Sequence, residues 1–176
     1  DLARPSTVYG QSKLAGEQAV LDSLDDYVIL RVAWMYGQHG KNFVKTMLHL
    51  GRDQVDQRAA GADVAPLKVV GDQYGNPTWT EDIVRQTQKI MGLGVMGLFH
   101  ATSEGETTWC QLAKDVFSIM RIDAAVTECT TAEFPRPALR PRRSSLENKR
   151  LKAYGLNVMR DYREALEQFL GALVEA

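Results

Sequence analysis

Hydrophobic residues recur along this chain at intervals that switch between the period of a helix and the continuous runs of a buried strand. Residues 7–21 carry one apolar stripe at helical spacing, and Pro5 and Ser6 precede it as a helix start. Residues 27–32 form a short apolar run rich in β-branched residues, which predicts a buried parallel strand. The same patterns predict helices at residues 42–50, 80–91, 107–120 and 161–174, and strands at residues 67–70, 98–101 and 125–129. Helices and strands therefore alternate, which is typical of an α/β fold.

Residues 51–65 interrupt this alternation. They are small and polar with no clear period, so we expect a surface loop there. No internal repeat or low-complexity tract divides the chain. With 176 residues, of which 44% are apolar, the sequence predicts a single α/β unit with a substantial core.

Composition and charge narrow the function classes. The formal net charge is −1 with both signs scattered along the chain, so nothing favours a nucleic acid or an anionic membrane as a partner. The longest apolar runs fall far short of the roughly 20 residues that span a bilayer, and the pattern of the first residues leads us to expect no signal peptide. Cys110 and Cys129 are too few for a disulfide framework, so we expect reduced thiols in a cytoplasmic protein.

One cluster of positive charge lies near the end of the chain. Between Arg136 and Arg143, arginines also stand at Arg140 and Arg142, interleaved with prolines. Two interpretations stay open: an ordinary solvated loop, or a loop that helps to hold a phosphorylated ligand.

A tyrosine and a lysine open the first predicted helix. Tyr9 and Lys13 are four residues apart, and 3.6 residues per turn places them on one helix face. A free phenol titrates at about pH 10, and a cation beside it stabilises the phenolate and lowers that pKa, which suits proton transfer. The spacing alone is a weak signal. A catalytic pair and an ordinary solvated helix face both stay open.

A glycine motif further along the chain is misleading. Residues 92–97, Gly-Leu-Gly-Val-Met-Gly, match the dinucleotide fingerprint G-x-G-x-x-G. That fingerprint works only where a strand enters and a helix leaves, so that the helix N-terminus faces the pyrophosphate. Here a predicted helix enters and a predicted strand leaves. We therefore reject residues 92–97 as a cofactor site and interpret the glycines as a helix stop.

Trp34 is the aromatic residue with the most telling position. It directly follows a predicted buried strand, at the carboxyl end where α/β sheets bind their ligands. It is either a core residue or a surface for a sugar or base. None of the three histidines has a second ligand at metal spacing, so no metal site is expected.

Several motifs together resemble one family. Residues 8–17, Val-Tyr-Gly-Gln-Ser-Lys-Leu-Ala-Gly-Glu, are similar to the active-site helix of extended short-chain dehydrogenases/reductases, and more narrowly of the dTDP-4-dehydrorhamnose reductases. Similar blocks follow in the family's order at residues 29–37, 42–48, 69–78, 97–101 and 108–113, and then at Arg136-Pro with Ser145-Leu146. The resemblance spans nearly the whole chain.

The resemblance implies a partial Rossmann-type parallel sheet, with the active-site helix and its strand at about residues 7–33 and a smaller substrate-binding lobe at about residues 34–176. It implies NADPH-dependent reduction of the C4 ketone of dTDP-4-dehydro-L-rhamnose, in the biosynthesis of surface polysaccharides, with NADH as the alternative cofactor. Tyr9 would be the general acid and Lys13 would bind the nicotinamide ribose and lower the pKa of Tyr9, so both would contact the cofactor. Trp34 would line the pocket of the dTDP-sugar. The resemblance leaves a homodimer open.

The chain departs from the family pattern in three places. The dinucleotide-binding half is absent from the sequence, so we expect the 176 residues alone to be inactive. Residues 51–64 are longer than the family's usual segment, and Arg143 stands where a small or amide residue is more common. Another sugar-nucleotide reductase or epimerase of the same family, and a non-catalytic binding subunit with the same fold, remain as alternative functions.

Overall fold

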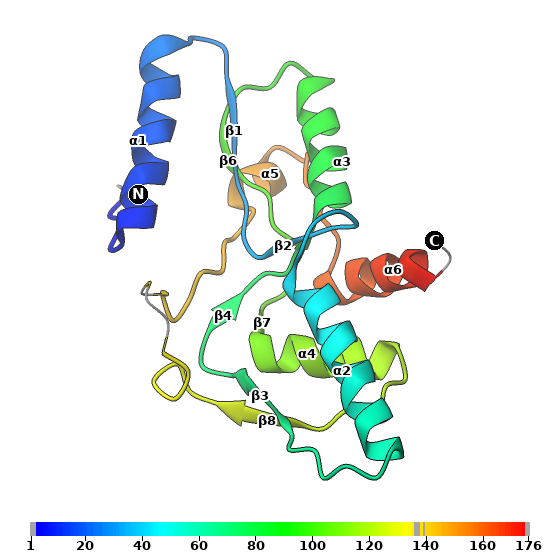
Figure 1. Cartoon of the computed structure of the whole chain (residues 1–176). Helices are drawn as coiled ribbons and strands as arrows, with labels where there is room; N and C mark the ends of the chain where they lie inside the picture. The colour runs from blue at the N-terminus through cyan, green and yellow to red at the C-terminus, as the bar shows by residue number, and fades with distance from the viewer. Residues whose placement is uncertain (1–2, 136–137, 139, 175–176) are drawn as a thin grey trace.

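A computed structural model describes residues 3–135, 138 and 140–174 (Figure 1). The helices are α1 (Val8–Ser23), α2 (Phe43–Ala59), α3 (Thr80–Met91), α4 (Trp109–Ile119), α5 (Lys149–Ala153) and α6 (Tyr162–Val174). The strands are β1 (Val28–Arg31), β2 (Met35–Tyr36), β3 (Leu67–Val70), β4 (Tyr74–Gly75), β5 (Thr78–Trp79), β6 (Gly97–His100), β7 (Thr107–Thr108) and β8 (Val126–Cys129). Every helix and strand that the sequence predicts is present, while α5 and the two-residue strands were not predicted.

The strands of the described ranges pair two by two. β1 runs parallel to β6, from Val28 opposite Gly97 to Arg31 opposite His100. β2 with β5 and β3 with β8 are also parallel, and β4 with β7 is antiparallel. Parallel strands end at the same edge of a sheet, so the segments that follow β1 and β6 meet there. The predicted α/β class with parallel pairing is confirmed.

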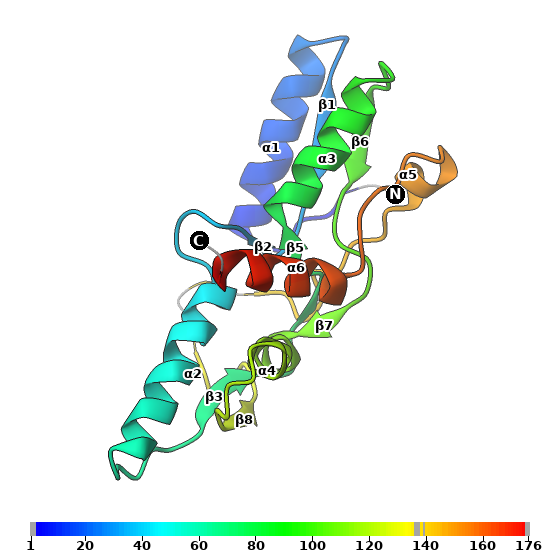
Figure 2. The ribbon, with the colours of Figure 1, turned by 90° about the vertical axis from the view of Figure 1, so that its right-hand side faces the viewer.

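Two hydrophobic cores hold the chain together. The larger joins α2, α4 and α6 with β3, and the smaller lies around β1, β6, α3 and α5 (Figure 2). Figure 2 shows α1 and α3 at one end of the molecule and α2, α4, β3 and β8 at the other, with α6 between them. None of the described helices combines the length and apolar character that a membrane crossing requires.

Helix α1 belongs to neither core. It contains no buried residue, although Figure 1 shows it alongside β1. A double hydrogen bond connects the two elements, because Arg31 donates through Nε and Nη2 to the two carboxylate oxygens of Glu17 at 2.7 and 2.6 Å. Bidentate pairs of this kind fix orientation as well as adding stability. The position of α1 along β1 therefore depends more on this ion pair than on the packing of buried side chains.

The predicted surface loop at residues 51–65 is wrong for its first nine residues, because α2 continues to Ala59. Gly51 is buried in the helix, where a Cβ would lie 2.4 Å from the ring of Phe117. Gln54 is 2% exposed, and its amide donates to the carbonyl oxygens of Ala65 and Ala125 while its oxygen accepts the N–H of Ala125. A glycine and a glutamine thus occupy the inward face of α2. Because neither residue is hydrophobic, the spacing of apolar residues does not show that the helix continues through these positions.

The interpretation of residues 92–97 is confirmed. Helix α3 ends at Met91 with Gly92 as its C-cap, and β6 begins at Gly97. A helix enters the glycine motif and a strand leaves it, which is the reverse of a dinucleotide-binding turn.

Candidate active site

Tyr9 and Lys13 lie together in the first half of α1. Thr7 caps the helix, and its hydroxyl accepts the N–H of Gly10 at 3.1 Å, so the helix begins one residue before Tyr9. The Nζ of Lys13 lies 5.4 Å from the centroid of the Tyr9 ring. Tyr9 is 71% exposed. The structure therefore brings the phenol and the ammonium group together on an open face of the helix.

This pair lies at the end of the molecule where β1 and β6 finish. Figure 1 shows α1 and β1 running in opposite directions, so the first turn of α1 and the carboxyl end of β1 are at the same end. The pair of Glu17 with Arg31 fixes that arrangement, since Glu17 lies two turns beyond Tyr9 and Arg31 is the last residue of β1. Trp34 follows three residues later. Open α/β sheets bind ligands at the carboxyl ends of their strands.

Trp34 is held on several sides. Its indole stacks on Trp109 with 3.6 Å between the ring centroids and 8° between the planes. Its Nε1 donates to the hydroxyl of Ser144 at 3.0 Å, and its carbonyl oxygen accepts the N–H of Thr78 at 3.2 Å. Trp34 is half-buried against the larger core, which agrees with its interpretation as a core residue, while contact with a sugar or base stays a prediction. Trp109 and Ser144 are contacts that sequence reasoning missed.

The basic loop passes beside Trp34. Tyr74 of β4 donates its N–H to the carbonyl oxygen of Arg142 and accepts the N–H of Ser144. The guanidinium group of Arg143 lies 5.4 Å from the Tyr74 ring centroid and donates to Glu106 at 3.1 Å. Arg140 and Arg142 are exposed, and Arg136 lies outside the described residues. The loop is therefore anchored through its backbone and through the side chain of Arg143, while Arg140 and Arg142 are exposed.

Asn76 joins this loop to the segment between β6 and β7. Its amide nitrogen donates to the carbonyl oxygen of Gly105 at 2.6 Å, and its amide oxygen accepts the N–H of Leu146 at 2.8 Å. Glu104 next to Gly105 accepts hydrogen bonds from three side chains. Burial raises the pKa of Glu104, but the hydrogen bonds from Lys152, Asn148 and Asn157 outweigh it, so the net pKa is lowered. The sequence signal for Asn76 was its position in the block at residues 69–78.

Comparison with known proteins defines the family. The family model described as the RmlD substrate binding domain matches residues 1–175. The chain belongs to the RmlD substrate binding domain family. The chain spans about half the length of the curated relatives that it matches, because it covers 55% of the first relative below.

Two curated members of this family illustrate the range of named activities. A dTDP-4-dehydrorhamnose reductase of Streptomyces griseus is 42% identical over 96% of this chain. A dTDP-4-keto-6-deoxy-D-glucose reductase of Streptomyces niveus is 40% identical over 93% of this chain, which covers 54% of that protein. Among solved structures, a dTDP-4-dehydrorhamnose reductase of Bacillus anthracis in complex with NADP has a TM-score of 0.88 and 33% identity, over 100% of this chain and 58% of that one.

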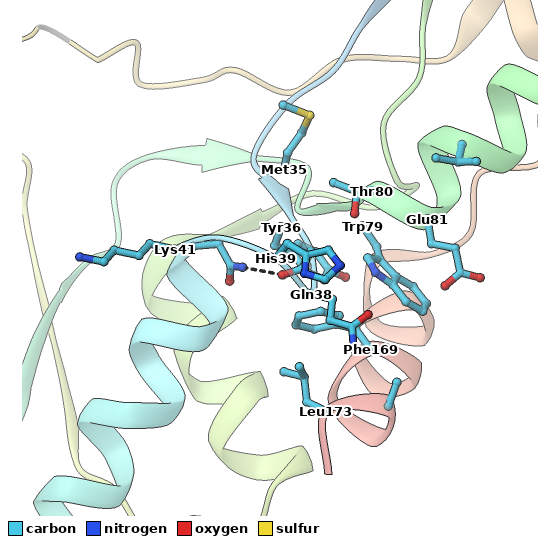
Figure 3. Close-up of a pocket in the computed structure, with 14 residues that line it drawn as sticks. Met35, Tyr36, Gln38, His39, Lys41, Trp79, Thr80, Glu81, Phe169 and Leu173 are labelled. Carbon is cyan, nitrogen blue, oxygen red and sulfur yellow. Dashed lines mark hydrogen bonds between the residues drawn. The ribbon is translucent and has the colours of Figure 1, made fainter. Parts of the chain in front are cut away.

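A cleft of about 410 Å³ lies away from the Tyr9–Lys13 pair in this member of the RmlD family. Figure 3 shows it between the segment after β2, the start of α3 and helix α6, with Tyr36, Trp79 and Phe169 inside and Glu81 and Lys41 at its edge. Its lining includes none of the three predicted site residues. Trp34 and Met35 are neighbours in the sequence but have different surroundings. Met35 lines this cleft, whereas Trp34 stacks on Trp109.

Proposed function

We propose that this chain is the catalytic and substrate-binding part of an NADPH-dependent reductase that converts the C4 ketone of dTDP-4-dehydro-L-rhamnose into the hydroxyl group of dTDP-L-rhamnose. The observation that carries the proposal is the pairing of Tyr9 with Lys13 in the first half of α1, at the same end of the molecule as the carboxyl end of β1. The named activity of the Streptomyces griseus relative supports the substrate, and the NADP in the Bacillus anthracis structure supports the cofactor. The activity belongs to the complete protein, since this chain covers about half of such a relative.

The residues present fit a nicotinamide cofactor in the chemistry of their donors. Lys13 carries three N–H donors and Tyr9 one hydroxyl that donates or accepts, which suits the hydroxyl groups of a ribose. Both side chains stand on an open helix face, where a ligand can reach them. When bound, NADPH supplies the hydride that reduces the ketone.

Tyr9 and Lys13 would divide the proton chemistry between them. The hydroxyl of Tyr9 donates its proton to the C4 oxygen of the sugar, which gains negative charge as the ketone is reduced. The ammonium group of Lys13 stabilises the phenolate that remains. Trp34 forms part of the wall against which the sugar is oriented. Because Tyr9 is largely exposed in this chain, the rest of the protein must exclude water around it before the proton transfer is efficient.

A second substrate of the same chemical class is supported by a specific observation. The Streptomyces niveus relative, named as a dTDP-4-keto-6-deoxy-D-glucose reductase, is nearly as similar to this chain as the Streptomyces griseus relative. Both named activities reduce a C4 ketone, so the same Tyr9 and Lys13 would serve either sugar. Comparing kcat/KM for the two keto sugars in the complete protein decides between them.

The variant Tyr9→Phe in the complete protein tests the proposal. We expect kcat to fall by about 10²-fold to 10⁴-fold, because the ring remains but the proton donor is lost. Binding of NADPH, followed by the fluorescence of the nicotinamide, should stay close to that of the wild type. Tyr154→Phe is the control, since Tyr154 is exposed at the end of α5 and should leave kcat unchanged. Normal turnover in Tyr9→Phe would leave a binding subunit as the better description of the fold.

A further inference from the structure

Trp34 holds a backbone conformation that a bulky residue rarely adopts. Its φ of 43° lies in the left-handed region, where residues other than glycine are uncommon. Such strain persists only where the surroundings over-determine it, and it clusters at ligand-binding sites. The contacts of Trp34 must therefore compensate for its backbone.

Both faces of the Trp34 indole are covered. Trp109 stacks on one face, with 3.6 Å between the ring centroids. A Cβ on Gly75 would lie 2.3 Å from Cε2 of Trp34, an atom of the ring fusion that can be approached only from a face. Two rings 3.6 Å apart leave no space for that Cβ between them, so Gly75 lies on the face opposite Trp109. Only the rim of the indole remains free to contact a ligand.

The orientation of Trp109 is fixed by contacts other than its stacking on Trp34. It is the first residue of α4, which Thr108 caps by accepting the N–H of Gln111 at 3.1 Å. Its Nε1 donates to the side-chain oxygen of Gln73 at 3.2 Å. The ring of Phe43, from the start of α2, has its centroid 4.6 Å from that of Trp109. The orientation of Trp109 thus comes from the larger core, at a distance from β1.

We propose that Trp109 is a positioning residue for Trp34. Its indole and the backbone of Gly75 hold the Trp34 ring between them in its left-handed conformation, so that Trp34 presents its rim to the sugar nucleotide. The larger core thereby sets the shape of the pocket wall at the end of β1. This inference rests on the proposed function, in which Trp34 forms part of the substrate pocket.

Variants of Trp109 in the complete protein test the inference by a split between kinetic parameters. In Trp109→Leu the flat support is lost, and we expect the KM for the keto sugar nucleotide to rise by about tenfold to 100-fold. The KM for NADPH should stay within about twofold, because Trp109 is in α4 and stacks on Trp34, whereas Tyr9 and Lys13 are in α1. Trp109→Phe keeps a flat ring and should restore most of the affinity for the sugar nucleotide.

Near-UV circular dichroism supplies a readout that a general loss of stability would not imitate. Stacked indoles couple their electronic transitions, so Trp109→Phe and Trp34→Phe should each remove the same coupled signal. Trp79→Phe is the matched control: Trp79 is the only other tryptophan, and it packs edge-to-face on Phe169 in the same core. That control should retain both the coupled signal and the KM for the sugar nucleotide.

The outcomes separate this inference from the function on which it rests. If Trp34→Ala leaves the KM for the sugar nucleotide unchanged, the role of Trp34 in the proposed function is wrong. If Trp34→Ala raises that KM while Trp109→Leu does not, only the positioning role is overturned, and absence of the coupled signal from the wild type also overturns it. Should Trp109→Leu fail to fold, Gly75→Ala displaces the same ring from its other face and should raise the same KM.

Discussion

At the scale of single residues, the candidate site combines side chains that are held very differently. Tyr9 is exposed and contacts Lys13 within its own helix. Trp34 is fixed by stacking on Trp109 and by a hydrogen bond to Ser144. A proton donor needs access to its ligand, whereas a pocket wall needs a fixed shape. The two kinds of environment therefore agree with the roles proposed for Tyr9 and Trp34.

Glu17 should make stability depend on pH through its pair with Arg31. The hydrogen bonds from Arg31 lower the pKa of Glu17 below its ordinary value of 4.5. A carboxylate with a lowered folded-state pKa stabilises the protein above its unfolded pKa, and this contribution is lost as the pH falls through the folded value. At pH 7, Glu17→Gln should therefore lower the free energy of unfolding by about 1 kcal/mol, and the difference from wild type should vanish at low pH.

Thermal unfolding of the wild type and of Glu17→Gln, from neutral pH to below pH 4.5, measures this dependence. Glu81→Gln is the control, because its pair with Arg85 is exposed within one helix. A difference between wild type and Glu17→Gln that stays constant with pH would show that the ion pair does not set it.

The sequence indicates candidate site residues where the signal is local and misses their contacts where it is not. Tyr9 and Lys13 were selected as candidates because four residues is nearly one helical turn. Trp34 was selected because it follows a recognisable strand. Ser144 was missed as its partner because 110 residues separate the two, and only the folded chain brings them together. No periodicity within one element can report such a contact.

At the scale of elements, hydrophobic periodicity predicted the helices and strands whose inward faces are apolar. Residues 67–70 are an example, since the predicted strand has the bounds of β3. The prediction ended α2 too early because Gly51 and Gln54 occupy its inward face. Gln54 is stabilised there by hydrogen bonds to the backbone, which composition does not reveal. The two-residue strands are too short for any period to register.

Two helical glycines should respond in opposite ways to the same substitution. In α1, Gly16→Ala adds a methyl group that meets nothing within 4 Å, so the better helix former should stabilise the protein by up to about 1 kcal/mol. In α2, the added Cβ of Gly51→Ala would lie 2.4 Å from the ring of Phe117. We expect a net loss of about 1–3 kcal/mol from overpacking. Urea unfolding of both variants gives the two free energies, and equal stabilisation by both would contradict the position of Phe117.

At the scale of the whole molecule, a buried ion pair links the two cores. Asp82 lies in the first turn of α3, which packs in the smaller core, and Arg160 precedes α6, which packs in the larger one. Arg160 donates through Nε to Asp82 at 2.8 Å, and its guanidinium group lies 5.2 Å from the Trp79 ring centroid. Asp82 is 1% exposed. The pair thus fixes the first turn of α3 relative to the segment that leads into α6.

Removing one member of this pair should be costly for the molecule as a whole. Asp82→Ala leaves the guanidinium group of Arg160 without its buried partner, and we expect a loss of about 3–5 kcal/mol in the free energy of unfolding. Glu81→Ala, one residue earlier, breaks the exposed pair with Arg85 and should cost less than about 1 kcal/mol. If the two cores depend on each other through Asp82, its loss should separate one unfolding transition into two in calorimetry. A single transition with the stability of the wild type would show that apolar contacts around α6 suffice to join the cores.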